Sequence, residues 1–163
     1  MSGKQIKLFL VDGTPGGLTT AEITNWTGHV LSASRSDLAD LVKRDEAQRT
    51  GAYILLGDDE SAVGNTRCYI GEADIVADRL RYHQRDKDFW DRVVIITSKD
   101  ANLTKAHGRY LESRLISLAT RESPLVCWRL LTLETRMESC RRNSHRASRP
   151  YAAIARRRRP LRC

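Results

Sequence analysis

Five side chains in the middle of the chain are of the types that act on phosphate esters. Hydrolysis of a phosphodiester requires an activated water, a positive charge opposite the phosphate and help for the leaving oxygen. Phenol, guanidinium, imidazole and carboxylate groups can supply these functions. Each residue also has a structural explanation, because tyrosines fill hairpin cores and charged residues line solvated helix faces. The five residues are Tyr53, Tyr69, Arg79, His83 and Glu112.

The elements that would hold these residues are predicted in the order β-β-α-β-α. Two short β-prone runs, at 52–56 and 67–71, are separated by a polar loop with two glycines, which is typical of a hairpin. A helix follows, and Arg79 and His83 lie four residues apart on one of its faces. The apolar run 93–97 predicts a buried strand, and leucines at helical spacing predict a second helix over 102–118.

The spacing of these residues resembles the GIY-YIG nuclease domain over residues 51–119. The two motifs read Gly51-Ala52-Tyr53 and Tyr69-Ile70-Gly71, with the tyrosines sixteen residues apart. Ten residues past the second tyrosine comes Arg79, His83 follows one turn later, and Glu112 lies in the late helix. The resemblance implies an α/β (α+β) fold in which helices flank a small, three-stranded, mostly antiparallel sheet.

The resemblance also implies a role for each matched residue. Glu112 would hold a divalent cation, and a lone carboxylate completed by water and substrate oxygens suits Mg²⁺. Tyr53 would orient or deprotonate the attacking water, with Tyr69 assisting by hydrogen bonding. Arg79 would grip the scissile phosphate through its planar fork, and His83 would support acid–base chemistry.

Two further residues in the late helix affect this interpretation. Lys105 precedes Glu112 by seven residues, so it lies on the same helix face and could bind substrate phosphate. A simple surface lysine is the alternative. Arg109 precedes Glu112 by three residues and could pair with it, which would make the carboxylate structural.

The chain departs from the family pattern at two places. The first motif has Ala52 where the family has isoleucine, which removes volume from a buried strand position but keeps the tyrosine. Family members often carry an asparagine beyond the metal-binding glutamate, near the active site. After Glu112 this chain has no asparagine before Asn143.

Composition divides the chain into three regions. Residues 1–48 are predicted to be an N-terminal extension with one strand, at 5–11, and one short helix, at 36–43; residues 49–120 are the nuclease-like domain. The first 120 residues hold 16 Lys and Arg against 17 Asp and Glu, a net charge of −1, whereas residues 121–163 hold 12 Arg and 3 Glu, a net charge of +9. This Arg-rich tail has the composition of an unstructured basic tail or of a segment translated out of frame.

The function expected from the sequence is metal-dependent endonucleolytic cleavage of nucleic acid, with DNA as the expected substrate. The alternative is a catalytically inactive nucleic-acid-binding or interaction module of the same fold. No apolar run approaches the ~20 residues needed to span a bilayer, so no membrane partner is expected, and the cytoplasm is the expected location. The sequence does not indicate the oligomeric state.

The charge distribution makes a prediction about binding. Removal of residues 121–163 is expected to abolish most of the non-specific affinity for nucleic acid, because the remaining chain is nearly neutral. The measurement is the affinity for random-sequence duplex DNA at several salt concentrations. If the truncated protein kept the salt dependence of the full chain, the residues that contact the phosphates would lie within the first 120 residues.

Overall fold

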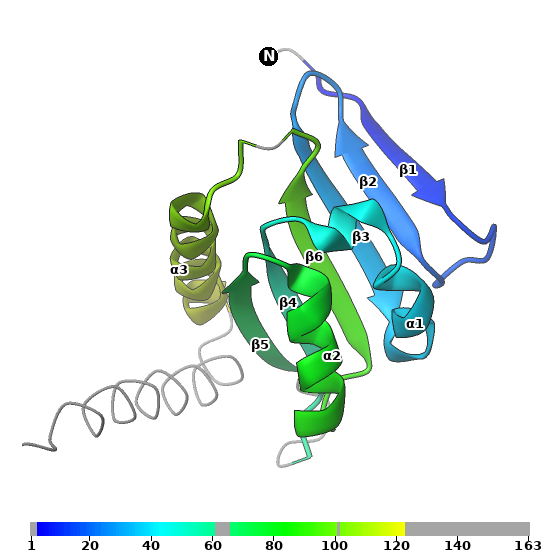
Figure 1. The fold of residues 1–163 in the computed structure, drawn as a ribbon, viewed down its shortest axis with the longest axis vertical. Helices are drawn as coiled ribbons and strands as arrows, with labels where there is room; N and C mark the ends of the chain where they lie inside the picture. Colours follow the sequence, from blue (N-terminus) through cyan, green and yellow to red (C-terminus); the bar gives the residue numbers. More distant parts are fainter. Residues whose placement is uncertain (1–2, 61–65, 101, 123–163) are drawn as a thin grey trace, which may run out of the picture. The chain divides into compact units, whose positions relative to one another are not determined.

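Six antiparallel strands form one sheet in the computed structural model, which describes residues 3–60, 66–100 and 102–122 (Figure 1). Their order across the sheet is β1-β2-β3-β6-β4-β5. The predicted α+β fold with an antiparallel sheet flanked by helices is confirmed, but the prediction of three strands is wrong. The strands are β1 (Ile6–Leu10), β2 (Thr19–Ile23), β3 (Gly28–Ser34), β4 (Gly51–Asp58), β5 (Thr66–Ala73) and β6 (Arg92–Ser98).

The three additional strands come from the segment that was predicted to be an N-terminal extension. β3 pairs with β6 along its whole length, from Gly28 opposite Ser98 to Ser34 opposite Arg92. β1 and β2 continue the sheet outward from β3. The sequence did not reveal β2 and β3 because threonine, serine, alanine and glycine weaken their hydrophobic alternation.

The helices follow the predicted order, since β4, β5, α2, β6 and α3 succeed one another along the chain. The predicted short helix at 36–43 is present as a 3₁₀ turn followed by one α-helical turn. No helix in the described ranges is long and apolar enough to cross a membrane. The helices are η1 (Arg35–Asp37), α1 (Leu38–Leu41), η2 (Asp45–Gln48), α2 (Val76–Asp86) and α3 (Lys105–Glu122).

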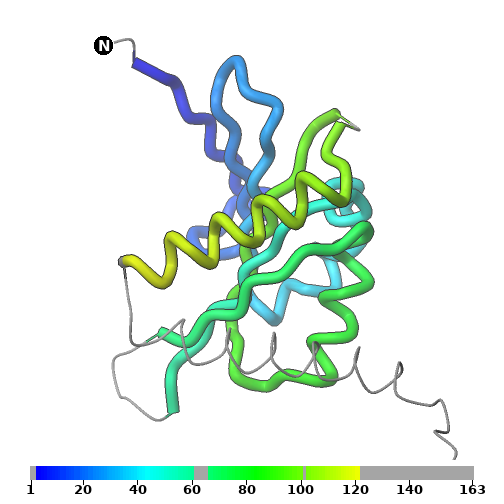
Figure 2. Tube along the Cα trace, turned by 90° about the vertical axis from the view of Figure 1, so that its left-hand side faces the viewer, coloured from blue at the N-terminus to red at the C-terminus, as the bar shows by residue number. Residues whose placement is uncertain are grey.

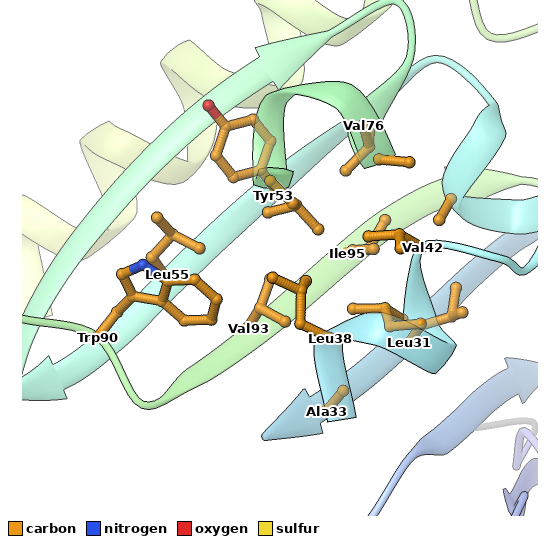
Figure 3. Packing of buried hydrophobic residues seen from close by; sticks show 14 of the residues in the cluster. Leu31, Ala33, Leu38, Val42, Tyr53, Leu55, Val76, Trp90, Val93 and Ile95 are labelled. Carbon is orange, nitrogen blue, oxygen red and sulfur yellow. The ribbon is translucent and has the colours of Figure 1, made fainter. Parts of the chain in front are cut away.

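The hydrophobic core lies on one face of the sheet, which we call the inner face. Residues paired across neighbouring strands share a face, so the register defines two rows of inner side chains. One row runs Leu31, Ile95, Tyr53, Gly71, and the other runs Ala33, Val93, Leu55, Tyr69. Helices α1 and α2 cover these rows with apolar side chains, among them Leu38, Val42 and Val76 (Figure 3).

Helix α3 packs on the opposite face, over β4 and β5. A Cβ added at Gly108 would lie 3.7 Å from the Cβ of Glu72, and Glu72 is paired with Ala52 on this outer face. The Arg109 Nε lies 3.7 Å from the Glu72 Oε1. The β4–β5 hairpin therefore lies between α2 and α3. Figure 2 draws α2 in green and α3 in yellow-green.

Arg35, at the end of β3, fixes the C-terminal end of α2. Its guanidinium donates hydrogen bonds to the carbonyl oxygens of Gln84 (2.9 Å), Asp88 (3.0 Å) and Trp90 (3.2 Å). It also lies 4.8 Å from the centroid of the Trp90 ring. Carbonyl oxygens at a helix end lack intrahelical partners, so Arg35 links the N-terminal strands to the helix that carries Arg79.

A core substitution in β3 tests whether the N-terminal strands belong to the same folding unit. Leu31 is completely buried, so Leu31→Ala is expected to lower the free energy of unfolding by about 2–5 kcal/mol. The matched control is Leu8→Ala in β1, where the side chain is 69% exposed and the expected change is within about 0.5 kcal/mol. Urea denaturation measures both variants. If Leu31→Ala lowered the free energy of unfolding as little as the Leu8→Ala control does, β3 would not contribute to the common core.

Candidate active site

Four of the five predicted site residues meet where the β4–β5 hairpin packs against α2. The Tyr53 hydroxyl and the His83 Nε2 are hydrogen-bonded at 2.8 Å. The Tyr69 ring lies 5.0 Å from the His83 ring, nearly edge-on, and 6.1 Å from the Tyr53 ring. Arg79 interacts by hydrogen bonding with both phenols. We call these four residues the tyrosine–histidine cluster.

Local structure explains why these side chains converge. Tyr53 and Tyr69 occupy adjacent rows of the inner face, and Arg79 and His83 lie one helical turn apart on the side of α2 that meets them. Gly71 makes room for the first tyrosine: a Cβ there would lie 2.5 Å from the Tyr53 hydroxyl oxygen. The glycine of the second motif is thus required by the tyrosine of the first.

Burial divides the cluster into an inner pair and an outer pair. Tyr53 has no exposed surface and His83 is 1% exposed, whereas Tyr69 is 9% exposed and Arg79 is half-buried. The Lys87 ammonium lies 4.7 Å from the Tyr69 ring centroid and the Tyr82 ring lies 5.3 Å from the Arg79 guanidinium carbon. Solvent therefore reaches the cluster at Arg79 and Tyr69.

The inner pair is electrically neutral at physiological pH. Burial raises the pKa of Tyr53 well above its ordinary value of 10, and the neighbouring Tyr69 adds to this rise. Burial lowers the pKa of His83 to about 4, helped by the charges of Arg79 and Lys87. A neutral imidazole has one donor and one acceptor nitrogen, and the Nδ1 of His83 has no hydrogen-bond partner among the described residues.

Glu112 comes from the other side of the sheet. It lies one turn after Gly108 in α3, the helix that packs on the outer face, and its side chain is half-buried. The cluster lies on the inner face. The β4–β5 hairpin therefore lies between the helix that carries Glu112 and the side chains of the cluster.

Lys105 begins α3 and forms an ion pair with Asp74 in which Nζ and Oδ2 are 2.6 Å apart. Both side chains are exposed, and pairs of this kind contribute little to stability because solvent screens them. The hydrogen bond and charge of Asp74 raise the pKa of Lys105, so the ammonium stays charged. Asn143 and the rest of the tail after residue 122 lie outside the described residues.

The described residues contain no group of three or more His, Cys, Asp or Glu side chains arranged to hold a metal ion. Mg²⁺ does not need such a group, because it retains several waters and binds through one or two carboxylates and substrate phosphates. Glu112 could serve as such a carboxylate.

Comparison of the chain with family models, with curated proteins and with solved structures gave no match. The site is therefore defined by the geometry of the chain itself. That geometry adds two residues to the rim of the cluster, Tyr82 and Lys87. Lys87 could have been found by extending the helical spacing of Arg79 and His83 by one further turn; Tyr82 carries no comparable signal in the sequence.

The depressed pKa of His83 makes stability depend on pH in a defined window. The imidazole is protonated below about pH 6.5 in the unfolded chain but stays neutral in the folded protein until the pH approaches 4. Above pH 6.5 the imidazole is mostly neutral in both states, so its protonation takes little from the free energy of unfolding. Between pH 6.5 and about 4 the unfolded chain binds a proton that the folded protein does not, so the free energy of unfolding falls as the pH falls. Lowering the pH from 6.5 to about 5 is expected to cost about 2 kcal/mol of unfolding free energy.

Urea denaturation across this range checks the prediction, with His83→Gln as the reference. Glutamine can still hydrogen-bond to Tyr53 but does not titrate, so the variant is expected to show a flatter pH profile. Parallel profiles for the two proteins would mean that the imidazole is protonated in the folded state as readily as in the unfolded chain.

Proposed function

We propose that this protein is a metal-dependent endonuclease that hydrolyses phosphodiester bonds of nucleic acid, with DNA as the substrate, in the manner of the GIY-YIG nucleases that its motifs resemble. The observation that carries the proposal is the tyrosine–histidine cluster. Two phenols, an imidazole and a guanidinium that lie up to 30 residues apart in the chain interact directly. Hydrophobic packing alone does not require these four polar groups to meet.

The exposed fraction of each side chain suggests which role it has in the proposed reaction. Arg79 and Tyr69 are the members that solvent reaches, so they would contact the phosphate and the attacking water. The guanidinium fork matches two phosphate oxygens. Tyr53 and His83 lie behind them as positioning residues, because their hydrogen bond fixes the phenol to which Arg79 also binds.

A proton can also leave the site through the inner pair. The attacking water would give a proton to the Tyr69 hydroxyl, which would pass its own proton to the hydrogen-bonded Tyr53 hydroxyl. Tyr53 would in turn release its proton to the His83 Nε2, 2.8 Å away. The low pKa of the imidazole means that it would hold this proton only briefly. The negative charge that develops on the phosphate would favour the transfer.

The cofactor of the proposed reaction is Mg²⁺ or another divalent cation. Glu112 would hold it, and the cation would supply positive charge to offset the charge that develops on the phosphate. β5 is the edge strand of the sheet within the described residues, so a substrate strand passing over that edge would approach α3 on the outer face and the cluster on the inner face.

A second candidate function is nucleic-acid binding without cleavage. The complete burial of Tyr53 and its existing bond to His83 favour it, since a buried tyrosine with a satisfied hydroxyl is a stable core residue. The Arg-rich tail would then supply phosphate contacts independent of sequence. The two functions differ in one observable property, which is metal-dependent cleavage.

Incubation of the full-length protein with supercoiled plasmid, in Mg²⁺ or in EDTA, tests the proposal. The wild-type protein is expected to nick the plasmid only with the metal. Glu112→Gln retains the size of the side chain but removes its charge, so cleavage is expected to fall by on the order of 10²-fold or more while binding in EDTA changes little. Gel electrophoresis and a filter-binding assay measure the two quantities.

Two arginines of α2 provide a matched control. Arg79→Ala is expected to abolish cleavage, whereas Arg81→Ala is expected to leave it unchanged because Arg81 points to solvent and pairs with Asp78 at 2.6 Å. Equal loss in both variants would indicate a general charge effect. A wild-type protein that binds plasmid but never nicks it, with any of Mg²⁺, Mn²⁺ or Ca²⁺, would establish the second candidate instead.

A further inference from the structure

The rim of the cluster contains an exposed aromatic ring that the proposed chemistry does not use. Tyr82 is 48% exposed on α2. Its ring lies 5.6 Å from the His83 ring, nearly edge-on, and 5.3 Å from the guanidinium carbon of Arg79. One part of the ring thus contacts the cluster, and another part faces solvent next to the residue assigned to the phosphate.

The neighbouring charges add to this arrangement. Arg79 on α2 and Lys87, directly after its last residue, are the cations on the side of the helix that meets the cluster, and the buried, neutral His83 lies between them. Lys87 lies against the ring of Tyr69, and only 12% of its side chain is exposed. The surface feature is therefore one exposed ring, Tyr82, beside one half-buried cation, Arg79. Proteins bind single-stranded nucleic acid with such groups, since cations contact phosphates and rings stack on bases.

We propose that Tyr82 stacks on an unpaired nucleobase adjacent to the phosphate that Arg79 binds. The substrate class is therefore nucleic acid with a single-stranded segment at the cleavage site. A base within a duplex is stacked on both faces and offers none to a protein ring, so the interaction requires a single strand or an extruded base. This inference rests on the proposed function, because it takes Arg79 as the phosphate contact.

A narrower role for Tyr82 has to be distinguished from stacking on a base. The ring could serve only to hold Arg79 in place. In that case its removal would weaken the phosphate contact, and the salt dependence of binding would fall with it. A stacking residue carries no charge, so its removal weakens binding while the salt dependence stays the same.

The experiment uses the full chain in EDTA and a single-stranded oligonucleotide that contains 2-aminopurine, whose fluorescence is quenched when it stacks. The variants are Tyr82→Ala and Tyr82→Phe, and the control is Tyr110→Ala, a ring 69% exposed on α3. The wild-type protein, Tyr82→Phe and the control are expected to quench the probe. Tyr82→Ala is expected to lose the quenching and to bind on the order of tenfold more weakly, with an unchanged salt slope.

Three results would overturn the inference. These are a Tyr82→Ala variant with wild-type quenching and affinity, a variant whose weaker binding comes with a reduced salt slope, and a wild-type protein that binds no single-stranded oligonucleotide. None of them decides the proposed function, because plasmid cleavage in Mg²⁺ is measured separately. Circular dichroism checks that the variant is folded, which is the expected outcome for a half-exposed side chain.

Discussion

The buried hydrogen bond between Tyr53 and His83 is the constraint on which the geometry of the site depends. Two polar groups removed from water are costly unless each is paired, and here they pair with each other at 2.8 Å. The bond fixes the rotation of α2 about its axis relative to β4. Once His83 points inward, the residues one turn before and after it, Arg79 and Lys87, are brought to the rim.

The sheet beneath this bond depends on the N-terminal strands. β6 lies between β3 and β4, so this strand, which carries Val93 and Ile95 of the core, is hydrogen-bonded on both sides only when β3 is present. Arg35 then connects the end of β3 to the last turn of α2. A fragment limited to residues 49–120 would expose the edge of β6 and leave carbonyl oxygens at the end of α2 without this donor.

The sequence predicted those features that depend on local spacing. Arg79 and His83 were placed on one helix face by their separation of four residues, and the two tyrosines were placed on a hairpin by the runs on either side of a polar loop. Long-range features were not predicted. Nothing local indicates that β3 pairs with β6, because the paired residues lie 58 (Ser34 and Arg92) to 70 (Gly28 and Ser98) positions apart in the sequence. The face of the sheet that α3 covers is determined by packing, so helical periodicity in residues 102–118 could not show that the helix of Glu112 lies on the opposite face from the side chains of the tyrosines.

The neutrality of the inner pair has a consequence for how the site would recognise its ligand. Tyr53 and His83 carry no charge at physiological pH, so the positive charge of Arg79 is not offset by the residues directly behind it. Elsewhere in the described chain, arginines such as Arg44 and Arg81 are paired with carboxylates. A guanidinium that contacts phenols instead of a carboxylate keeps its electrostatic attraction for an incoming anion. This is the property that a phosphate-binding arginine needs, and it would be lost if either phenol were replaced by an acid.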